Sequence, residues 1–435
     1  MILNSQVPLH RLLLSLSEAL DRIHPHVVDH QQRVAYIATR IAREMGIVGK
    51  DLVDVFHAAV VHDIGLVGHE ARRLAIAEGK LVEVGDHEEI GYLLMRDNPL
   101  FTRAAEILRF HHVPWAEGRG REHNGHEVHL ASHIVNLADR LERMIDHDRP
   151  VLEQTEDILE QVRNDNGPQF RGDCVEALLE ISAAEGFWLD ATSPRIYSLL
   201  LEQVDWPTIV IDEQMLEPIA EMFARLVDAT SPWTAVHSAG VTATAVELAK
   251  RLRFSRREQK VMKAAGFLHD IGKLAVPAYI LDKPGRLSPS EMHIVKTHPY
   301  HTFRILRTIG GMPQIAEWAA FHHERLDGQG YPFRHTAEEL TLGSRIMAVA
   351  DVFTAVTEDR PYRRGMQSQR AKSVLQNMAD NGALDGDVVR ELVRDFDGVD
   401  QARTAMQVEY GDKQKAIRQL MAPPECRSET AAVGV

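Results

Sequence analysis

The sequence predicts an all-α fold made of two helical domains in tandem. Apolar residues recur at steps of three and four, as in Val34, Ile37, Ala38 and Ile41, which is the period of a helix that buries one face. Alternating strand patterns are scarce. The length of 435 residues is sufficient for two domains with separate cores.

A set of histidines and aspartates occurs twice in the same order. The first half contains His30, His62, Asp63, His87, His111, His112 and Asp139, and the second half contains His237, His269, Asp270, His298, His322, His323 and Asp351. In both halves the first two histidines are 32 residues apart, and the third precedes the adjacent pair by 24 residues. Because 23 scattered histidines would not readily repeat this order, we expect a duplicated metallohydrolase domain.

The residue types favour a metal centre whose adjacent ligand pairs can serve two ions. Histidine and carboxylate ligands suit iron, manganese, zinc or nickel rather than calcium. Adjacent residues project about 100° apart on a helix, so His322 and His323 can face two different ions. A carboxylate such as Asp270 can bridge two cations, while Asp351, beside an apolar helical stripe, is costly to bury without a cation.

The elements of each half follow in the same order. The period of Ile346, Val349 and Phe353 predicts a helix around Asp351. Each half then closes with a similar turn and helix, Asn166-Gly167 with Gly172-Asp173 and Asn381-Gly382 with Gly386-Asp387. We therefore expect a first domain at 10–185, a connector at 186–215 that is partly helical, a second domain at 216–397 and a polar C-terminal tail at 398–435.

Composition excludes several other classes of protein. The formal charge is −14, from 49 basic and 63 acidic residues, so we expect no DNA or RNA binding. The two cysteines, Cys174 and Cys426, support neither a disulfide framework nor a cysteine zinc site, which fits a cytoplasmic location. We expect no signal peptide and no membrane span, because the first residues lack a basic leader and a cleavage site and no apolar window is long enough. A homodimer is compatible with helical domains, although no residue pattern requires one.

The second half resembles the HD-GYP family of bacterial cyclic-dinucleotide phosphodiesterases. The resemblance covers most of 216–397 and rests on His237-Ser238, His269-Asp270-Ile271-Gly272-Lys273, His298-Pro299, the run from His322 to Pro332, Asp351-Val352-Phe353 and Arg360-Pro361-Tyr362-Arg363. It implies two metal ions, usually iron or manganese, that activate a water for attack on phosphorus. The implied ligands are His237, His269, Asp270, His298, His322, His323 and Asp351, with Asp270 bridging.

The same resemblance implies how substrate is held. Lys273 would contact a phosphate oxygen, and Arg360 and Arg363 would grip the second phosphate. Gly330, Tyr331 and Pro332 would shape the guanine pocket.

Three positions depart from the family pattern. Trp233 stands where some members have a glutamate that binds a third metal, so two metals are expected here. Thr302 replaces a usual glycine and Thr354 a common aspartate. Because neither change removes a ligand, we still expect activity.

The first half resembles the broader HD phosphohydrolase superfamily. All seven ligand positions of that half are matched, so a second metal site is expected there. However, Leu66 occupies the place of Lys273, and Val113, Pro114 and Trp115 follow the histidine pair instead of a Gly-Tyr-Pro run. The metals would remain while the contacts to a cyclic dinucleotide are lost.

Several functions remain open at this point. The resemblance implies hydrolysis of cyclic di-GMP, the commoner substrate of the family, or of 3′,3′-cyclic GMP-AMP, to a linear dinucleotide and beyond. The first domain is either a second hydrolase, for instance a 5′-nucleotidase, or a regulatory metal-binding module. The alternative class is a catalytically inactive nucleotide sensor, against which the complete ligand set and Lys273 argue.

Overall fold

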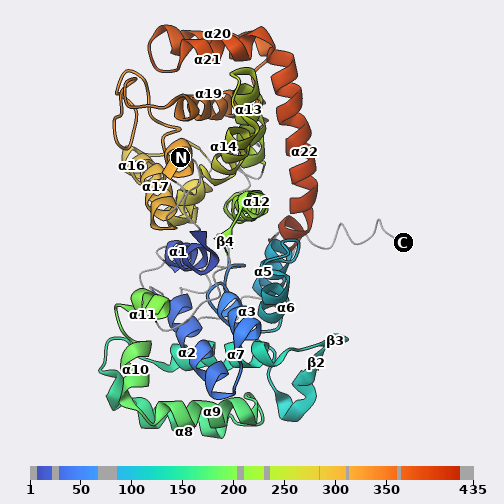
Figure 1. The fold of residues 1–435 in the computed structure, drawn as a ribbon, viewed down its shortest axis with the longest axis vertical. Coiled ribbons are helices and arrows are strands. Elements are labelled where there is room, and N and C mark those ends of the chain that lie inside the picture. Colours follow the sequence, from blue (N-terminus) through green and yellow to red (C-terminus); the bar gives the residue numbers. More distant parts are fainter. Residues whose placement is uncertain are drawn as a thin grey trace. The chain divides into compact units, whose positions relative to one another are not determined.

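The computed structural model describes residues 7–21, 29–66, 86–202, 210–229, 236–283, 285–309, 313–359 and 364–421. Helices dominate these residues, which confirms the predicted all-α fold (Figure 1). The described strands have two residues each: β1 (Val7–Pro8), β2 (Glu122–His123), β3 (His126–Glu127) and β4 (Val210–Ile211). The chain divides into two compact units. Of the described residues, 8–66 and 86–202, with the gap at 22–28, form the N-terminal unit, and 210–421 with its gaps belongs to the C-terminal unit.

The N-terminal unit is assembled around α2. Its helices are α1 (Leu9–Asp21), α2 (His30–Glu44), α3 (Gly49–Ala59), α5 (His87–Met95), α6 (Thr102–Arg109), η2 (Ala116–Arg121), α7 (Leu130–Met144), η3 (Val151–Glu153), α8 (Thr155–Asn164), α9 (Gly172–Ser182), α10 (Glu185–Ala191) and α11 (Ile196–Glu202). Helix α2 packs against α3, α7 and α9. Its predicted apolar stripe of Val34, Ile37, Ala38 and Ile41 is fully buried. This packing fixes the helix in the core, and with it the position of His30, the first residue of the helix.

Residues that the sequence assigned mainly to a connector fold as α10 and α11 in the N-terminal unit. Phe187 and Trp188 are buried, and the Trp188 indole donates a hydrogen bond of 3.0 Å to the carbonyl of Ser182. Both helices also contact α2. Two adjacent aromatic residues in a short segment show no helical period, so the sequence pattern alone could not assign this segment to a core.

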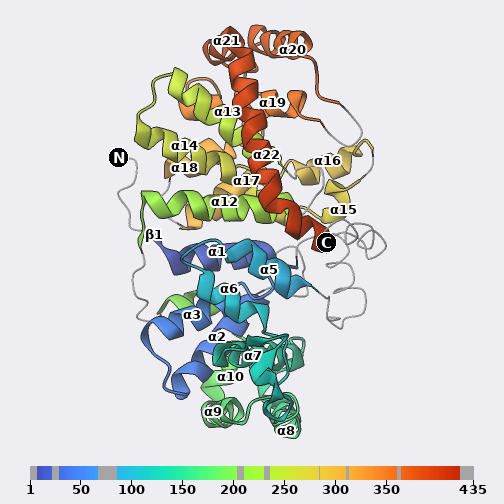
Figure 2. The same ribbon diagram turned by 90° about the vertical axis from the view of Figure 1, so that its right-hand side faces the viewer.

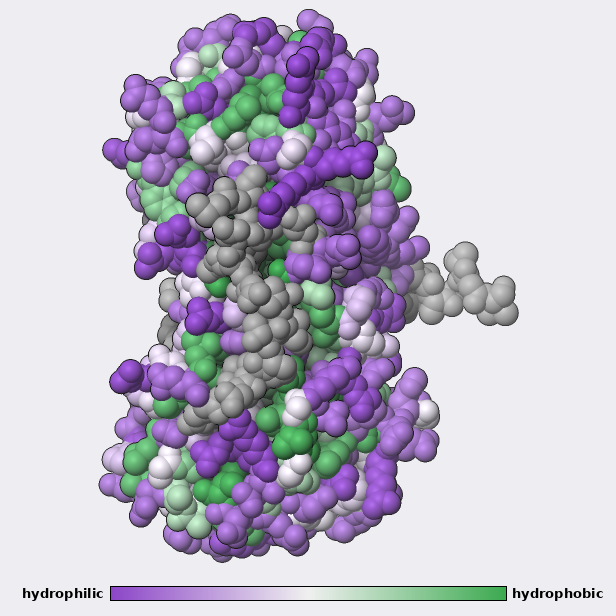
Figure 3. Space-filling model, viewed as in Figure 1, coloured by the Kyte–Doolittle hydropathy of each residue, from purple (hydrophilic) through white to green (hydrophobic). Residues whose placement is uncertain are grey.

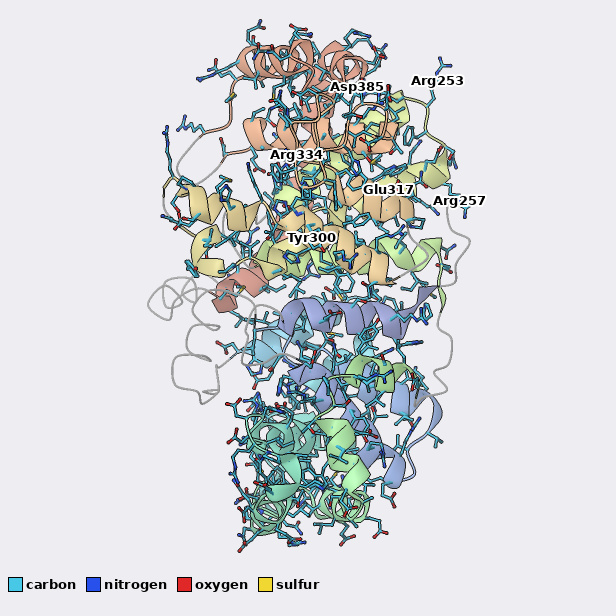
Figure 4. All side chains as sticks on the ribbon, turned by 90° about the vertical axis from the view of Figure 1, so that its left-hand side faces the viewer. Arg253, Arg257, Tyr300, Glu317, Arg334 and Asp385 are labelled. Atoms are coloured by element: carbon cyan, nitrogen blue, oxygen red, sulfur yellow. The ribbon has the colours of Figure 1, made fainter. Side chains whose placement is uncertain are left out.

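The C-terminal unit is assembled around α13. Its helices are α12 (Glu213–Ala229), α13 (His237–Arg251), α14 (Arg256–Leu268), η4 (Ile271–Ala275), α15 (Ala278–Leu281), α16 (Pro289–Val295), α17 (His298–Ile309), α18 (Pro313–Ala320), α19 (Leu342–Thr357), α20 (Ser368–Asp380), α21 (Gly386–Arg394) and α22 (Phe396–Met421). Helix α13 packs against α14, α19 and α22. Asp385 caps α21 through the amides of Asp387 and Val388 and pairs with Arg345 of α19 (Figure 4).

The segment from residue 398, predicted as a polar tail, differs from that expectation. It continues α22, which runs along α13 and also contacts α12 (Figure 2). The buried positions Phe396, Arg403, Tyr410 and Ile417 follow a seven-residue repeat. Arg403 is one of these buried residues, so the buried face of α22 is not continuously apolar. The sequence therefore lacks the apolar period that would have predicted a packed helix here. Residues 422–435 lie outside the described residues.

Hydrophilic side chains dominate the described surface of each unit in Figure 3, with scattered apolar residues between them. None of the described helices combines the length and the apolar character needed to cross a membrane.

Candidate metal centres

The C-terminal unit brings its seven predicted ligand residues together at helix ends. His237 begins α13 and His298 begins α17. The pair His269-Asp270 directly follows α14, and the pair His322-His323 lies one residue beyond the end of α18. Asp351 lies within α19. The ligand atoms form two groups, and within each group they all lie within 4.8 Å of one another. One group contains His237, His269 and Asp351, and the other contains His298, His322 and His323. The sequence order of the motif therefore becomes two neighbouring groups of ligand atoms.

Asp270 lies between the two groups. Its Oδ2 is 3.2 Å from His269 Nε2, and its Oδ1 is 3.3 Å from His298 Nε2 and 4.0 Å from His322 Nε2. The side chain is almost fully buried. Burial alone would raise the pKa of this carboxyl, but His269 and Lys273 offset that effect and hold the pKa well below its usual range. Asp270 is therefore a carboxylate with one oxygen toward each group.

The histidines are oriented by the helices that precede them. The Nδ1–H groups of His269, His298 and His322 donate to carbonyls three residues earlier, at 2.7, 2.8 and 2.7 Å. Because a carbonyl can only accept, these bonds leave Nε2 free to bind a metal. Burial lowers the pKa of His298 to about 3 and that of His322 to about 4, so both are neutral, as ligands must be.

A glycine allows the close approach on which this centre depends. A Cβ atom on Gly272 would lie 2.0 Å from the carbonyl oxygen of His298. In the N-terminal unit, a Cβ on Gly65 would lie 1.9 Å from the carbonyl oxygen of His87. Thr302, the residue that replaces the family glycine, donates to the carbonyl of His269 at 2.9 Å and accepts from the Gly272 amide at 3.0 Å. The Thr302 hydroxyl therefore links α17 to the backbone on both sides of Asp270.

Lys273 and the segment after the histidine pair border the C-terminal centre. Lys273 donates a hydrogen bond of 2.5 Å to Asp270 Oδ2. His323 has 28% of its side chain exposed, and its ring lies 4.8 Å from that of Tyr331. The exposed edge of the centre is therefore at His323. Arg360, Arg363 and Trp233 lie outside the described residues.

Buried Glu324 shapes the loop that carries Gly330, Tyr331 and Pro332. Its carboxylate accepts hydrogen bonds from the amides of Phe333 and His335, at 2.7 and 3.0 Å. A Cβ on Gly330 would lie 2.5 Å from the Arg325 amide nitrogen, so only glycine fits there. The sequence pattern does not single out Glu324 as a site residue, because a glutamate in a loop usually lies in solvent.

The N-terminal unit repeats this arrangement. His30 begins α2, His87 begins α5, and the pairs His62-Asp63 and His111-His112 follow α3 and α6, with Asp139 in α7. Asp63 Oδ2 is 3.4 Å from His62 Nε2, and Asp63 Oδ1 is 3.4 Å from His87 Nε2. Asp139 Oδ1 is 3.2 Å from His30 Nε2. Asp63 thus corresponds to Asp270 in position and in the direction of its oxygens.

Each centre also contains a buried glutamate that lies outside the repeated motif. His237 Nδ1 lies 3.1 Å from Glu358, and His30 Nδ1 lies 2.5 Å from Glu142. Such a carboxylate orients a ligating imidazole and increases its basicity. Glu142 follows Asp139 by three residues, whereas Glu358 follows Asp351 by seven, so the internal repeat did not reveal the pair.

A second missed residue is Arg143. Its Nε donates to Asp139 Oδ1 at 2.8 Å, and its Nη2 lies 3.8 Å from Asp63 Oδ2. The N-terminal centre therefore has a cation against its carboxylates, although Leu66 occupies the place of Lys273. The cation comes from α7 rather than from the turn after the His-Asp pair, which is why a position-by-position comparison overlooked it.

The donor set fits divalent metal ions. Nε2 atoms of His62, His111 and His269 are buried and have no hydrogen-bond partner among the described residues. A buried polar atom without a partner is costly, and a cation would satisfy all of these lone pairs together with the aspartates. Both clusters can therefore bind metal.

Comparisons with known proteins agree with this duplication. Models of the HD domain match residues 27–144 and 221–388. The 3′3′-cGAMP-specific phosphodiesterase 1 of Vibrio cholerae is 29% identical over 401 residues, which cover 89% of this chain and 92% of the relative. The cyclic di-GMP phosphodiesterase response regulator RpfG of Xanthomonas campestris is 33% identical over 169 residues, which cover 38% of this chain and 44% of the relative.

A solved structure shares the fold. The crystal structure of a cyclic GMP-AMP specific phosphodiesterase of Vibrio cholerae aligns with a TM-score of 0.61 at 24% identity, covering 90% of this chain and 98% of that one. The repeated His/Asp centres, the two domain matches and these relatives lead to one conclusion. This chain carries two HD domains, at residues 27–144 and 221–388, and over most of its length it is similar to HD-type cyclic-dinucleotide phosphodiesterases.

Proposed function

We propose that the C-terminal unit hydrolyses a bacterial cyclic dinucleotide to the linear dinucleotide. The observation that carries the proposal is Asp270, whose two oxygens face two separate groups of histidines. Relatives of this half are named for cyclic di-GMP or for 3′3′-cGAMP, and a relative that spans both halves is named for 3′3′-cGAMP. We therefore infer that 3′,3′-cyclic GMP-AMP is the preferred substrate and cyclic di-GMP the competitor.

Two divalent ions, iron or manganese, would be held at this site. His237, His269 and Asp351 would bind one ion, His298, His322 and His323 the other, and Asp270 both. Divalent ions bound here would supply an activated water and offset the negative charge that develops on the phosphate.

The residues around the exposed edge would bind and orient the substrate. Lys273, with its ammonium group beside Asp270, would donate to a phosphate oxygen as substrate enters. Arg360 and Arg363 would hold the second phosphate. Tyr331 lies beside His323 and, with Gly330 and Pro332, would border one base, and the tyrosine ring offers a surface for stacking.

The products of the two candidate substrates test this proposal. Manganese-loaded protein is given each cyclic dinucleotide separately, and products are identified by mass spectrometry. We expect linear dinucleotide from both substrates, formed faster from 3′,3′-cyclic GMP-AMP, and none from a His269→Ala/Asp270→Ala variant. Binding without cleavage by the metal-loaded wild type would instead support the sensor.

The N-terminal unit has two candidate roles. One is a second hydrolase, for instance a 5′-nucleotidase acting on the linear product, and the other is a regulatory metal-binding module. Arg143 favours the hydrolase, because it places a cation against Asp63 and Asp139 where a phosphate would need one. A His62→Ala/Asp63→Ala variant separates the two roles: the hydrolase requires that inorganic phosphate release stops while ring opening continues, and full phosphate release would exclude it.

A further inference from the structure

A cavity of about 470 Å³ adjoins the N-terminal centre, and neither the motif nor the proposed ring-opening reaction explains it. His112 lies in its wall, so the cavity reaches the cluster at the second histidine of the adjacent pair. His112 is also only partly buried, as is His323 in the other unit. Each centre is thus accessible at the second histidine of its adjacent pair. In the N-terminal unit this histidine lines a cavity.

A hairpin that carries two histidines, His123 and His126, also lines the cavity. Strands β2 and β3 pair antiparallel with His123 opposite His126, and Asn124-Gly125 forms the turn with positive φ angles of 49° and 78°. Asn-Gly is the favoured sequence for such a tight turn. Since paired residues of a hairpin lie on one face, both imidazoles project together, and their rings lie 6.2 and 6.1 Å from that of Phe110.

This hairpin occupies the position in the repeat where the C-terminal unit has its Gly-Tyr-Pro loop. Both segments lie between the adjacent histidine pair and the helix that carries the next aspartate, although η2 separates His112 from the hairpin. In the C-terminal unit that loop places Tyr331 beside His323. The N-terminal unit places the ring of Phe110 and two imidazoles beside its own open edge instead. An aromatic surface for a flat group is therefore kept, although its residues differ.

The polar lining is rich in hydrogen-bond acceptors. Glu88 and Glu89 both line the cavity. Arg109 binds Glu89 with two hydrogen bonds, of 2.6 and 3.0 Å, which neutralises that pair. Glu88 has 23% of its side chain exposed and contacts His87 Nδ1 at 3.3 Å. The cavity thus suits a flat ligand that donates hydrogen bonds at its edge. A negatively charged group of the same ligand would bind at the N-terminal metal cluster, near Arg143.

We propose that this cavity binds the base of a guanine 5′-nucleotide, with the phosphate directed toward His112 and the N-terminal cluster. Guanine stacks on the Phe110, His123 and His126 rings and offers two adjacent N–H donors that one carboxylate such as Glu88 can accept. The inference extends the hydrolase role proposed for the N-terminal unit and does not depend on ring opening at the C-terminal centre.

Binding is measured on full-length, manganese-loaded protein that carries His269→Ala and Asp270→Ala, which disables the C-terminal centre. The probes are the 5′-phosphonate analogues of GMP and AMP, in which a methylene group replaces the ester oxygen and prevents hydrolysis, and methylphosphonate, which lacks sugar and base. Calorimetry gives affinity, and hydrogen–deuterium exchange locates the site. We expect the guanine analogue to bind at least about tenfold more tightly than the other two and to slow exchange at 122–127.

Variants then test the assignment. His123→Ala/His126→Ala should weaken the guanine analogue by about tenfold and leave methylphosphonate unchanged. The fold should survive, because both side chains are exposed. Glu88→Gln should reduce the preference for guanine over adenine. The matched control is His129→Ala, since His129 lies next to the hairpin but outside the cavity lining, and it should bind like the parent. Equal affinity for all three probes, exchange slowed only at 322–332, or insensitivity to the hairpin variant would overturn the proposal.

Discussion

Single carboxylates decide how each centre is arranged. Asp270 and Asp63 each direct one oxygen to each side of a histidine cluster. Glu358 and Glu142 lie behind the first histidine of each set. The first pair was recognisable in the sequence because its spacing repeats. The second pair was not, because different helical turns supply the two glutamates.

Glu358 should matter for metal affinity. Glu358→Ala removes the acceptor for His237 Nδ1 and leaves a buried imidazole without orientation, so we expect metal affinity of the C-terminal centre to fall about 10- to 100-fold. Glu358→Gln keeps an acceptor oxygen and should lose much less. Metal retained after dialysis, measured by mass spectrometry, checks the result. Equal retention by the alanine variant and the wild type would exclude this role.

Gly272 should be intolerant of any side chain. In Gly272→Ala the new Cβ would meet the His298 carbonyl, so η4 and α17 must separate, and we expect a loss of about 1–3 kcal/mol in the free energy of unfolding. Ring opening should be lost with it. Gly186→Ala is the control, because no atom lies within 4 Å of its added Cβ and alanine favours a helix. Denaturant titration compares the two, and similar stabilities would refute the steric argument.

At the scale of elements, the two units place a cation and a substrate-facing segment beside the metal ligands, but they use different helices and loops to do so. The cation at the C-terminal centre comes from η4 as Lys273, and at the N-terminal centre it comes from α7 as Arg143. A loop follows the histidine pair in one unit and a hairpin in the other. Sequence comparison detects residues that keep their position and misses a charge that moves to another helix.

The two cations should have separable effects. Lys273→Met removes a donor to the phosphate, so we expect ring opening to slow by about 100- to 1,000-fold with metal content unchanged. Arg143→Met should leave ring opening unchanged, because it belongs to the other centre. Rates of linear dinucleotide formation under saturating substrate distinguish them. Equal slowing in both variants would contradict the assignment.

Helix α22 should contribute to the stability of the C-terminal unit despite its polar composition. Ile417 is fully buried, and Ile417→Ala should cost about 2–5 kcal/mol in the free energy of unfolding. Val408 on the same helix is 61% exposed, so Val408→Ala should change stability by less than about 0.5 kcal/mol. Thermal or denaturant unfolding checks the difference. A negligible effect of Ile417→Ala would mean that α22 does not belong to the cooperative core.

At the scale of the whole molecule, duplication explains how much the sequence could predict. Helical periodicity predicted the all-α fold, and the repeated spacing identified the fourteen residues that the structure gathers into two clusters. The pattern of apolar and polar residues does not predict the packed face of α22, in which a buried arginine replaces an apolar residue. Nor does it report the cavity beside His112, because a hairpin of exposed histidines reads as an ordinary surface turn.

The most direct test of the central claim is an electron paramagnetic resonance spectrum of manganese-loaded protein carrying His62→Ala and Asp63→Ala, which leaves only the C-terminal centre. Two manganese ions about 3.5–4 Å apart, as in two-metal sites, couple magnetically and give a spectrum unlike that of isolated ions. We predict a coupled signal that disappears when Asp270→Ala is added. A spectrum of isolated manganese before that change, or a coupled signal that survives it, would contradict a two-metal centre joined by Asp270.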